Sequence, residues 1–373
     1  MKIILSGGGT GGSITPLLAI AEEIKLSKKS VDFLWIGTRN GLEEQMAEKE
    51  NIKFKAIYSG KLRRYFSFKN FIDIFRIKLG FFQSFRIIYK FKPDMIITAG
   101  SFVAVPVVWA GWILKAPILV HQQDVKVGLA NKLMTPFASI ITCSIEESVV
   151  DFRRNEGNDS MCRIQKRICF TGNAIRRNIL DCQRKRHPVI SSSTERDIPI
   201  ILVLGGGTGA LAVNKIVVQS ILELTKICNV IHITGGKFPN SCRNEALPRL
   251  HRENSYRRHS FLNNIEEAYA ESDLVISRAG MGVLSELAVL KKPVIIIPIP
   301  DSHQEANAKY FADRNAAVFL NQKDLTPEIL ASTVKNILAD KSRLSRLSEN
   351  ISKIMPRDGA KKIAEIIMGE IRK

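Results

Sequence analysis

Two glycine-rich clusters in the sequence have the composition of phosphate-binding loops. Residues 7–12 follow the apolar run 2–6, and residues 205–210 follow the apolar run 199–204. A buried strand that turns through glycines into a helix leaves backbone N–H groups at the start of the helix, and these donors attract phosphate together with the helix dipole. The sequence therefore predicts one phosphate-binding loop in each half of the chain. The alternative is that the glycines only make tight turns, and the repetition in both halves argues against it.

The first cluster also fits the Gly-x-Gly-x-x-Gly fingerprint of dinucleotide-binding proteins, at Gly7, Gly9 and Gly12. An NAD enzyme needs, in addition, an acidic residue at the end of the second strand to hold the ribose hydroxyls. The corresponding run, 31–36, ends in a Gly-Thr-Arg sequence, in which Arg39 would at best suit NADP. The second cluster lacks the acid too, so an oxidoreductase is the minor alternative.

Apolar runs alternate with helical patterns along the whole chain, which predicts parallel sheets covered on both faces. The strand candidates are 2–6, 31–36, 53–58, 94–98, 117–121, 139–143, 199–204, 229–233, 273–277, 293–298 and 316–320. The helical patterns include 16–25, 42–50, 212–224, 282–290 and 304–314. The fold class expected is α/β, with two Rossmann-like domains that face each other across a cleft.

The expected domain boundary lies near residue 175. Residues 1–175 would form the first domain and 176–357 the second, and an amphipathic segment at 358–373 would pack back on one of them. A chain of 373 residues is long enough for two domains of ordinary size. The polar stretch 183–197 is expected to be a surface excursion near the junction.

The composition bounds the partners and the compartment. The net charge of +19 favours a polyanionic partner, which could be a nucleic acid, an anionic lipid or a phosphorylated substrate. The six cysteines form no C-x-x-C pair, so neither a disulfide framework nor a metal site is expected. We expect a cytosolic protein with reduced cysteines instead. The N-terminal apolar run is too short for a signal peptide, and the longest apolar stretch, 102–114, is too short to span a bilayer.

Further motifs carry a resemblance to a known family. In chain order they are Gly7-Gly8-Gly9-Thr10-Gly11-Gly12-Ser13-Ile14-Thr15-Pro16, Gly37-Thr38-Arg39-Asn40-Gly41-Leu42-Glu43, His121-Gln122-Gln123-Asp124, Gly172-Asn173-Ala174-Ile175-Arg176, Ser277-Arg278-Ala279-Gly280 and His303-Gln304-Glu305-Ala306-Asn307-Ala308. Together they resemble the MurG family, which transfers N-acetylglucosamine (GlcNAc) from UDP-GlcNAc to the undecaprenyl-linked muramyl-pentapeptide precursor of peptidoglycan. The resemblance implies the GT-B fold, with the donor bound mainly by the C-terminal half and the lipid acceptor by the N-terminal half.

The resemblance also implies site residues. The donor-binding set is Thr10, Gly11, Gly12, Asp124, Arg176, Gly207, Thr208, Leu262, Met281, Gly282, Val283, Leu284, Ser285, Glu286 and Gln304. The acceptor and phosphate loop is Gly9, Thr10, Gly11, Gly12 and Ser13. Glu286 would hold the ribose hydroxyls, the backbone at Leu262 would meet the uracil edge, and Gln304 would bind sugar hydroxyls. The structural alternatives are an acid near a helix N-terminus for Glu286 and a helix-surface amide for Gln304.

The chain departs from the family pattern at several of these positions. Ser13 stands where the family has histidine, and Gln122 and Asp124 replace the usual acid and amide. A hydroxyl such as that of Ser13 has no useful basicity near neutral pH. Our hypothesis is that Asp124 supplies the general base of an inverting transfer, with His121 as the second candidate. Ser13 is the third member of the candidate catalytic set. No D-x-D metal signature occurs in a suitable place, so neither a metal nor a cofactor is expected.

Aromatic and basic residues alternate between residues 61 and 92. The pattern predicts an amphipathic helix on an anionic membrane surface, as suits a peripheral enzyme at the cytoplasmic face of the cell membrane. The expected membrane patch is Arg63, Arg64, Phe71, Phe75, Phe81, Phe82 and Phe85. The main alternative is an aromatic stripe that packs on the core beneath an ordinary basic face, and nucleic acid is not the expected partner.

The sequence thus predicts an inverting, UDP-GlcNAc-dependent glycosyltransferase of peptidoglycan synthesis that acts on an undecaprenyl-linked acceptor. Two alternatives stay open. One is a related transferase that acts on another lipid. The other is a UDP-sugar-binding or scaffold protein that has lost turnover, which the missing histidine would explain.

Overall fold

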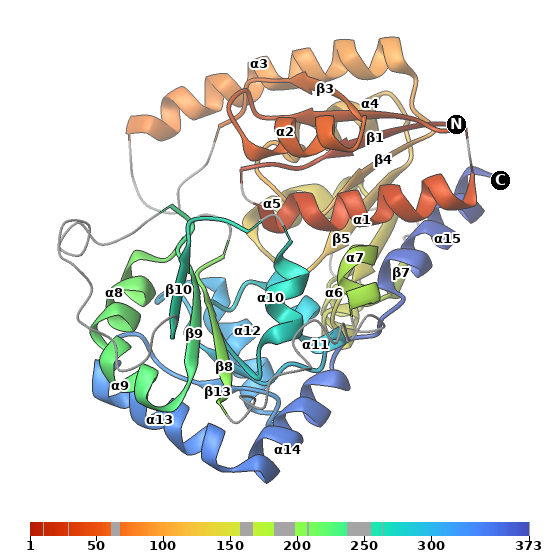
Figure 1. Cartoon of the computed structure of the whole chain (residues 1–373). Coiled ribbons are helices and arrows are strands. Elements are labelled where there is room, and N and C mark those ends of the chain that lie inside the picture. Colours follow the sequence, from red (N-terminus) through yellow and green to blue (C-terminus); the bar gives the residue numbers. More distant parts are fainter. Residues whose placement is uncertain are drawn as a thin grey trace. The chain divides into compact units, whose positions relative to one another are not determined.

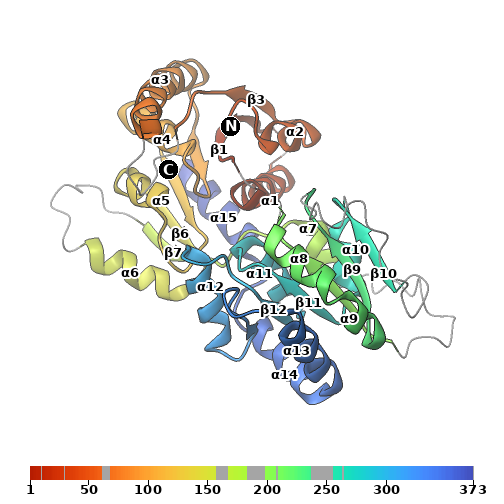
Figure 2. The same ribbon diagram turned by 90° about the vertical axis from the view of Figure 1, so that its left-hand side faces the viewer.

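The chain divides into two units, each built on one parallel sheet (Figures 1 and 2). The computed structural model describes residues 1–9, 11–28, 30–60, 68–156, 167–182, 198–206, 209–236, 255–262 and 264–372, without the side chains of 68–72 and 154–156. Unit 1 comprises Met1–Arg176 and Pro356–Lys373, and unit 2 comprises Arg177–Met355.

Unit 1 has a seven-stranded parallel sheet in the order β3-β2-β1-β4-β5-β6-β7. Its strands are β1 (Lys2–Ser6), β2 (Asp32–Gly37), β3 (Lys53–Ala56), β4 (Met95–Thr98), β5 (Ile118–Gln122), β6 (Ile140–Cys143) and β7 (Arg167–Phe170). Its helices are α1 (Gly11–Ser27), α2 (Leu42–Lys49), α3 (Phe68–Phe91), α4 (Ala104–Ile113), α5 (Leu129–Met134), the short 3₁₀ helix η1 (Thr135–Phe137), α6 (Glu146–Glu156) and α15 (Gly359–Ile371).

The sheet of unit 1 is buried on both faces, as its apolar strands require. Successive side chains of β1 point to opposite faces, so Ile3 and Leu5 join one core cluster and Ile4 joins the other. The first cluster lies under α1, and the second lies under α3 and α4 (Figures 1 and 2). This double covering holds the carboxyl ends of the strands rigidly at one edge of the sheet.

The C-terminal helix α15 completes the first of these two clusters. Its buried residues Ala360, Ile363, Ala364 and Ile367 follow the spacing of one helix face and pack against α1. In both ribbon views α15 lies alongside α1, although more than 330 residues separate the two helices in the sequence. The last segment of the chain is therefore an integral part of unit 1.

Unit 2 has a six-stranded parallel sheet in the order β10-β9-β8-β11-β12-β13. Its strands are β8 (Ile200–Leu204), β9 (Asn229–Ile233), β10 (Tyr256–His259), β11 (Leu274–Ser277), β12 (Val294–Ile296) and β13 (Val318–Phe319). Its helices are α7 (Arg177–Cys182), α8 (Leu211–Gln219), α9 (Ile221–Ile227), α10 (Ile265–Glu271), α11 (Met281–Val289), α12 (His303–Ala312), α13 (Pro327–Ala339) and α14 (Lys341–Ser352).

Every strand expected from the sequence is present, within four residues at either end. The pattern missed β7 and β10, and both lie at the edge of their sheets. Edge strands need no continuous apolar run, and β10 carries a charged Tyr-Arg-Arg-His sequence. The helix expected over 212–224 is wrong as one element, because the structure divides it at Ser220, whose hydroxyl bonds back to the carbonyl of Ile216 at 2.8 Å.

The longest apolar stretch, 102–114, forms the buried helix α4 and is not a membrane span. A Cβ atom at Gly111 would collide with Ile96 of β4, so the glycine allows the helix to pack closely on the sheet. Among the described residues, no helix combines the length and apolar character that crossing a bilayer requires.

Candidate functional site

The strand orders point to one edge of each sheet. Both units use the doubly wound order 3-2-1-4-5-6. The first three strands are added toward one side of the sheet and the fourth and later strands toward the other, so the strand order reverses between the first and the fourth strand. Ligands of such sheets bind outside the carboxyl ends of the strands at this switch point. In unit 1 the switch point lies between β1 and β4, and in unit 2 it lies between β8 and β11. Each glycine cluster follows the first of these strands.

The first glycine loop has room for no other residue at two positions. Gly9 has a φ of +83°, and a Cβ atom there would lie 2.9 Å from the ring of Phe102. A Cβ atom at Gly7 would lie 2.9 Å from both Leu17 and the carbonyl of Ser13. The loop therefore turns tightly over the sheet and leads into α1 at Gly11, where added atoms would meet nothing within 4 Å. Thr10 lies outside the described residues.

A buried carboxylate on α2 holds this loop in place. Glu43, at the start of α2, is 0% exposed. Its Oε2 accepts a hydrogen bond from the N–H of Gly9 at 3.3 Å, and its Oε1 accepts from the N–H and hydroxyl of Thr38 at 2.7 and 2.5 Å. Glu43 thus ties the end of β2 to the phosphate loop. Glu43 stands in one of the matching runs of the sequence, but its role could not be predicted, because its burial cannot be seen in the run itself.

The hydroxyl groups of Ser13 and Ser101 also fix the loop. Both hydroxyls donate to the carbonyl of Gly8, at 3.2 and 2.9 Å respectively. Ser101 follows β4 and has a φ of 145°, which is a strained conformation for a residue with a side chain. The carboxyl ends of β1 and β4 are therefore joined at the switch point. Ser13, named from the sequence as an uncertain catalytic residue, is buried and serves this loop contact.

His121, the second candidate for the base, is completely buried in β5. Its Nδ1 lies 2.9 Å from the hydroxyl of Thr142 and its Nε2 lies 3.0 Å from Oδ1 of Asn173. Burial lowers the pKa of His121 to about 4, so the imidazole is neutral at physiological pH. This geometry favours the structural interpretation, in which His121 positions Asn173.

Asp124 lies in the turn that follows β5, at the same carboxyl edge as the glycine loop, and is half-buried. Gln122 shapes this turn from inside: its Nε2 donates to the carbonyl of Asp124 at 2.6 Å, and its Oε1 accepts from Asn131 at 2.6 Å. Ser148 of α6 donates to the carbonyl of Val125 at 3.3 Å. The replacement of the family's acid by Gln122 therefore coincides with a buried amide that orders the turn carrying Asp124.

In unit 2 the second glycine loop begins at Gly205 after β8. Gly206 and Gly209 have φ values of +80° and +71°. A Cβ atom at Gly209 would lie 2.5 Å from the carbonyl of Thr234 at the end of β9, which explains the glycine there. Gly207 and Thr208 lie outside the described residues. Asn214 of α8 donates to the same Thr234 carbonyl at 3.0 Å and so joins the two strand ends.

Glu286 lies on the second turn of α11, which follows β11 at the switch point. The carboxylate is half-buried, and its Oε2 accepts a hydrogen bond from the hydroxyl of Tyr269 at 2.9 Å. Tyr269 is itself buried in α10, so the carboxylate is held in place from a second helix. No feature of the sequence predicted this contact, because Tyr269 follows the pattern of an ordinary core residue of α10.

The other predicted residues of α11 divide into two groups. Met281, Leu284 and Ser285 have buried side chains, so only their backbone groups can reach a ligand. Gly280 precedes the helix and Gly282 lies in its first turn, and a Cβ atom at either would meet none of the described residues within 4 Å. Val283 is half-buried. The N-terminus of α11 thus opens toward unoccupied space beside the ribose-binding candidate Glu286.

Gln304 and Leu262 follow the carboxyl ends of two strands of the unit 2 sheet, β12 and β10. Gln304, in the first turn of α12, is half-buried and accepts a hydrogen bond from the N–H of Ile299 at 3.1 Å through Oε1. Leu262 follows β10 and is also half-buried. Arg278 is buried beneath the site. Its Nη1 donates to the carbonyls of Ile297 and Pro298 at 3.0 and 2.9 Å and so fixes the backbone that follows β12. Within unit 2, the predicted donor residues that the structure describes therefore belong to one edge of the sheet.

Arg176 is the last residue of the first segment of unit 1. Its Nε atom is buried, and among the described residues no hydrogen-bond partner reaches it. A buried guanidinium nitrogen without a partner is rare in proteins and suits an anionic ligand.

The aromatic residues of α3 divide between the surface and the core. Phe75 and Phe82 are 67% and 68% exposed, as expected of a membrane patch. Phe81 and Phe85, which were expected on the same patch, are half-buried and pack against the core cluster beneath α3, as the alternative interpretation of an aromatic stripe on the core predicts. The helix is amphipathic, and its buried face is wider than the spacing of its aromatic residues predicts. Arg63 and Arg64 lie outside the described residues, as does the side chain of Phe71.

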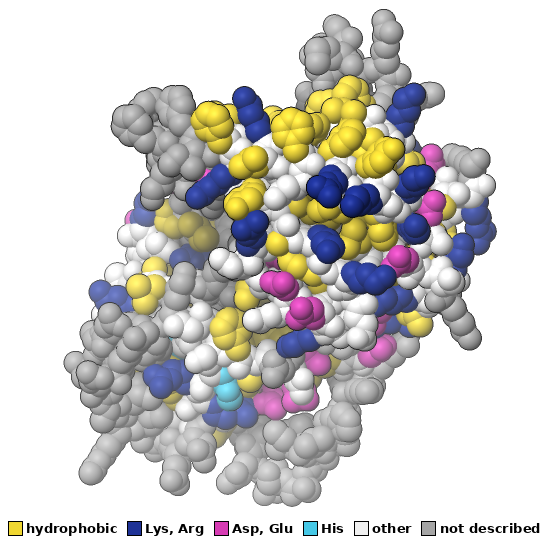
Figure 3. Space-filling model, turned by 90° about the horizontal axis from the view of Figure 1, so that it is seen from above, with side chains coloured by type: hydrophobic (Ala, Val, Ile, Leu, Met, Phe, Trp, Pro, Cys, Tyr) yellow, Lys and Arg dark blue, Asp and Glu magenta, His cyan; other side chains and the backbone are white. Residues whose placement is uncertain are grey.

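The exposed face that α3 retains mixes apolar and basic groups. Ile74, Leu79 and Tyr89 are exposed beside the two phenylalanines, and Lys78 and Arg86 are exposed among them. Figure 3 looks down on this side of unit 1 and shows hydrophobic side chains interspersed with lysines and arginines. We call Ile74, Phe75, Leu79, Phe82 and Tyr89 the apolar face of α3.

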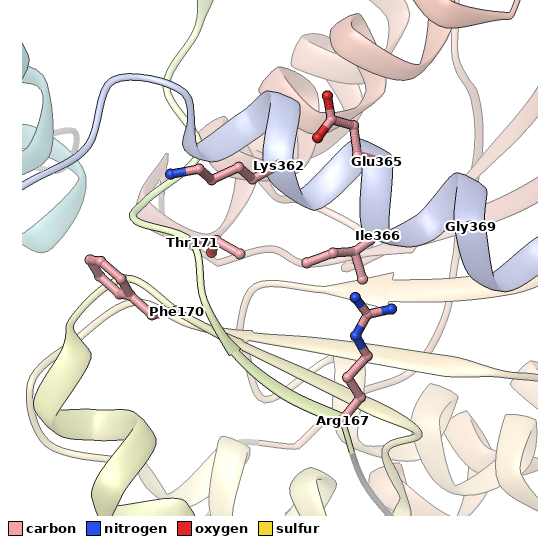
Figure 4. Close-up of a pocket in the computed structure, with 7 residues that line it drawn as sticks. All are labelled: Arg167, Phe170, Thr171, Lys362, Glu365, Ile366 and Gly369. Atoms are coloured by element: carbon pink, nitrogen blue, oxygen red, sulfur yellow. The ribbon is translucent and has the colours of Figure 1, made fainter.

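A cavity of about 360 Å³ lies between β7 and α15 (Figure 4). Arg167 of β7 and Lys362 of α15 line it, together with Phe170 and Glu365. Lys362 also forms an ion pair with Asp358 at 3.0 Å. None of the predicted site residues lies there. Among the described residues, no cluster of three histidine, cysteine or acidic side chains could hold a metal ion.

Comparison with protein families identifies both halves of the chain. Residues 3–142 match the N-terminal domain of glycosyltransferase family 28, and residues 200–365 match the C-terminal domain of the same family.

Curated relatives extend over the whole chain. One from Borrelia garinii is 33% identical over 100% of this chain and 97% of its own length, and one from Clostridium kluyveri is 35% identical over 90% and 91%. Both are named UDP-N-acetylglucosamine--N-acetylmuramyl-(pentapeptide) pyrophosphoryl-undecaprenol N-acetylglucosamine transferase. The crystal structure of Acinetobacter baumannii MurG has the same fold, with a TM-score of 0.70 over 99% of both chains at 22% identity.

Proposed function

Because the chain belongs to glycosyltransferase family 28, we propose that it transfers GlcNAc from UDP-GlcNAc to an N-acetylmuramyl-(pentapeptide) pyrophosphoryl-undecaprenol acceptor. Relatives that carry this name align with the chain from end to end, and the expected glycine loops stand at the switch points of both sheets. The single observation that carries the proposal at the site is the half-buried carboxylate of Glu286, fixed by Tyr269 beside the N-terminus of α11.

We assign the donor to unit 2. The carboxylate of Glu286 accepts hydrogen bonds from the ribose hydroxyls, because two neighbouring hydroxyls are matched by two carboxylate oxygens. The diphosphate lies against the glycine loop after β8 and the N-terminus of α11, where backbone N–H groups offset its charge. The amide NH₂ group of Gln304 donates to sugar hydroxyls, since Oε1 of this side chain already accepts from Ile299. The backbone at Leu262 meets the uracil edge.

We assign the acceptor to unit 1, with its diphosphate at the loop of residues 9–13. Asp124 acts as the general base: its carboxylate takes the proton of the acceptor hydroxyl as the oxygen attacks the anomeric carbon. The new C–O bond forms on the face opposite to the leaving group, and the bond to the diphosphate breaks with its electron pair on UDP. The configuration at the anomeric carbon is therefore inverted.

We further propose that the protein works at the cytoplasmic face of the cell membrane as a peripheral protein. The apolar face of α3, with lysine and arginine side chains around it, is the surface that would contact anionic lipid. The reaction itself requires neither a metal nor a cofactor, because backbone amides and the Arg176 side chain supply the positive charge for the leaving group.

A turnover assay tests the proposed function. The purified protein is incubated with UDP-GlcNAc and a short-chain analogue of the acceptor, and both UDP release and the mass of the lipid product are followed. The proposal expects equimolar UDP and a product heavier by one GlcNAc residue. UDP release only with a diacylglycerol acceptor would favour a transferase for another lipid. Binding of UDP-GlcNAc without any turnover would favour the scaffold alternative.

A further inference from the structure

An apolar cavity of about 240 Å³ lies in unit 1 close to the first glycine loop. Ile77 of α3, Val105 and Trp109 of α4, and Leu129, Ala130 and Leu133 of α5 line it, together with Phe102. None of these side chains carries a charge, so the cavity suits a hydrocarbon. Its volume exceeds the approximately 150 Å³ of a cavity that accommodates benzene.

The cavity adjoins the phosphate loop directly. The ring of Phe102 forms part of its wall, and the same ring lies 2.9 Å from where a Cβ atom of Gly9 would be. One side chain therefore separates the apolar space from the backbone that would bind a diphosphate. A ligand that fills both places must have an anionic head joined to an apolar chain.

The cavity is held in shape by a polar contact at its edge. Trp109 donates a hydrogen bond from Nε1 to the carbonyl of Leu133 at 3.0 Å, which fixes the indole between α4 and α5. α3 and α4 lie side by side in both ribbon views and pack against each other. The walls of the cavity are thus held by contacts within unit 1 itself, and a site whose walls are already fixed loses less entropy on binding.

The open side of the cavity leads toward exposed apolar residues. Leu129, which lines it, is 39% exposed. Ile77 lies one helical turn from Ile74, which belongs to the apolar face of α3 and is 43% exposed. A chain that leaves the cavity therefore passes along apolar surface.

We propose that this cavity binds the isoprene units nearest to the diphosphate of the acceptor, while the rest of the chain stays in the membrane. The inference rests on the proposed function and names the part of the acceptor that unit 1 recognises. The volume fits a branched segment of one or two isoprene units and excludes the whole undecaprenyl chain. The cavity then selects for a lipid that is branched next to its diphosphate and places that diphosphate at the glycine loop.

The test fills the cavity with a larger side chain and compares the binding of phosphate head groups that carry an apolar chain with the binding of head groups that lack one. Ala130 is half-buried in its wall, so Ala130→Phe introduces a ring into the space, and Ala130→Leu is the milder version. The control is Phe319→Ser, which removes an exposed ring in unit 2, outside both the cavity and the apolar face of α3. Binding of geranyl phosphate and methyl phosphate is measured by the change in tryptophan emission in a Trp112→Phe background, in which Trp109 lines the cavity and the only other tryptophan, Trp35, is completely buried. The acceptor KM is measured with a geranyl-linked acceptor.

We expect the parent protein to bind geranyl phosphate at least about tenfold more tightly than methyl phosphate, since each buried methylene contributes about 0.8 kcal/mol. Both Ala130 variants should abolish this preference and raise the KM for the geranyl-linked acceptor, with the KM for UDP-GlcNAc unchanged. Phe319→Ser should keep the preference.

Equal binding of the two phosphates by the parent protein, or a preference that survives in folded Ala130→Leu, would overturn the inference. Because phosphate binding does not require turnover, this result is distinct from a failure of the proposed function, which would show as absence of UDP release in the parent protein.

Discussion

Asp124 is the residue on which the proposed chemistry of unit 1 depends most. The change Asp124→Asn keeps the size of the side chain and removes its ability to take a proton at neutral pH. A positioned general base contributes about 10²- to 10⁴-fold, so we expect kcat to fall by that factor while the KM for UDP-GlcNAc changes little. The measurement is UDP release at saturating substrates. Asp151→Asn, at an exposed site on α6, is the control, and an unchanged kcat in Asp124→Asn would remove Asp124 from the mechanism.

Glu43 should act as a positioning residue for the phosphate loop. In Glu43→Gln one acceptor oxygen is replaced by an NH₂ group, which must face a backbone N–H, either that of Gly9 or that of Thr38. We expect unit 1 to lose about 1–3 kcal/mol of unfolding free energy. We also expect the KM for the acceptor to rise, with the KM for UDP-GlcNAc unchanged.

The control for this change is Glu48→Gln, at an exposed position of the same helix. All three tryptophans of the chain, at positions 35, 109 and 112, lie in unit 1, so their fluorescence in urea reports the unfolding of this unit. If Glu43→Gln behaves like Glu48→Gln in both stability and acceptor KM, the carboxylate does not hold the loop.

His121 should make the stability of unit 1 depend on pH. The unfolded imidazole has a pKa near 6.5, whereas burial lowers the native pKa to about 4. Between these two values the unfolded chain binds the extra proton, so the free energy of unfolding falls by roughly 1.4 kcal/mol for each unit of decreasing pH. Above pH 6.5 the imidazole is neutral in both states, so this loss of stability is absent there. Urea unfolding followed by tryptophan fluorescence should show this slope, and His121→Gln should lose it. An equal slope in both proteins would contradict the assignment.

At the residue scale the family resemblance assigns roles to single residues but not the contacts that support them. Glu286 is expected to bind ribose because of that resemblance, and it lies on α11 after β11, at the switch point of unit 2. The support that Glu43 gives to Gly9, and Tyr269 to Glu286, could not be predicted, because each contact joins residues 17 or more positions apart through the tertiary fold. For the same reason the burial of His121 became visible only in the structure.

The helix α3 carries the prediction that belongs to the scale of elements. Its exposed Phe75 and Phe82 should enter the interface of a membrane, while its basic residues contribute about 1 kcal/mol each near anionic lipid. We expect the double change Phe75→Ser and Phe82→Ser to weaken sedimentation with phosphatidylglycerol vesicles by at least about tenfold. Phe319→Ser, at an exposed position of β13 in unit 2, should have no effect. Vesicle binding that is unaffected by the double change would show that this face does not contact the membrane.

The elements themselves followed from simple patterns except at one edge of each sheet. Central strands such as β1 and β8 are continuous apolar runs because both faces of the sheet are covered, and the sequence alone located them. The edge strands β7 and β10 contain arginine and were missed. In α3 the spacing of the aromatic residues located the helix correctly but did not show which ring faces the core, because phenylalanines occupy both faces.

At the scale of the whole molecule, both units repeat one strand order with a glycine loop after the first strand. This repetition is why two short clusters were enough to predict a chain of two Rossmann-like domains. The same repetition says nothing about which unit binds which substrate, because a fold does not determine a function. That assignment depends on individual side chains, of which Glu286 in unit 2 and Asp124 in unit 1 are the most specific.

The net charge of +19 is a property of the whole chain and is consistent with polyanionic partners. Within the proposed function those partners are a nucleotide sugar, a lipid diphosphate and an anionic membrane. All three share phosphate chemistry, so the composition alone could not separate them, and the sites that the structure describes are needed to assign each to a place.

The most direct test of the account is the affinity of the protein for UDP-GlcNAc, measured by titration calorimetry. We predict that Glu286→Gln weakens binding by about 10- to 100-fold, because hydrogen bonds to a charged group contribute about 1.5–3 kcal/mol. The glutamine can still accept from Tyr269, so the helix contact is kept. Glu328→Gln, at a fully exposed site of α13 in the same unit, should bind as the parent protein does. Parent-like affinity in Glu286→Gln would contradict the account.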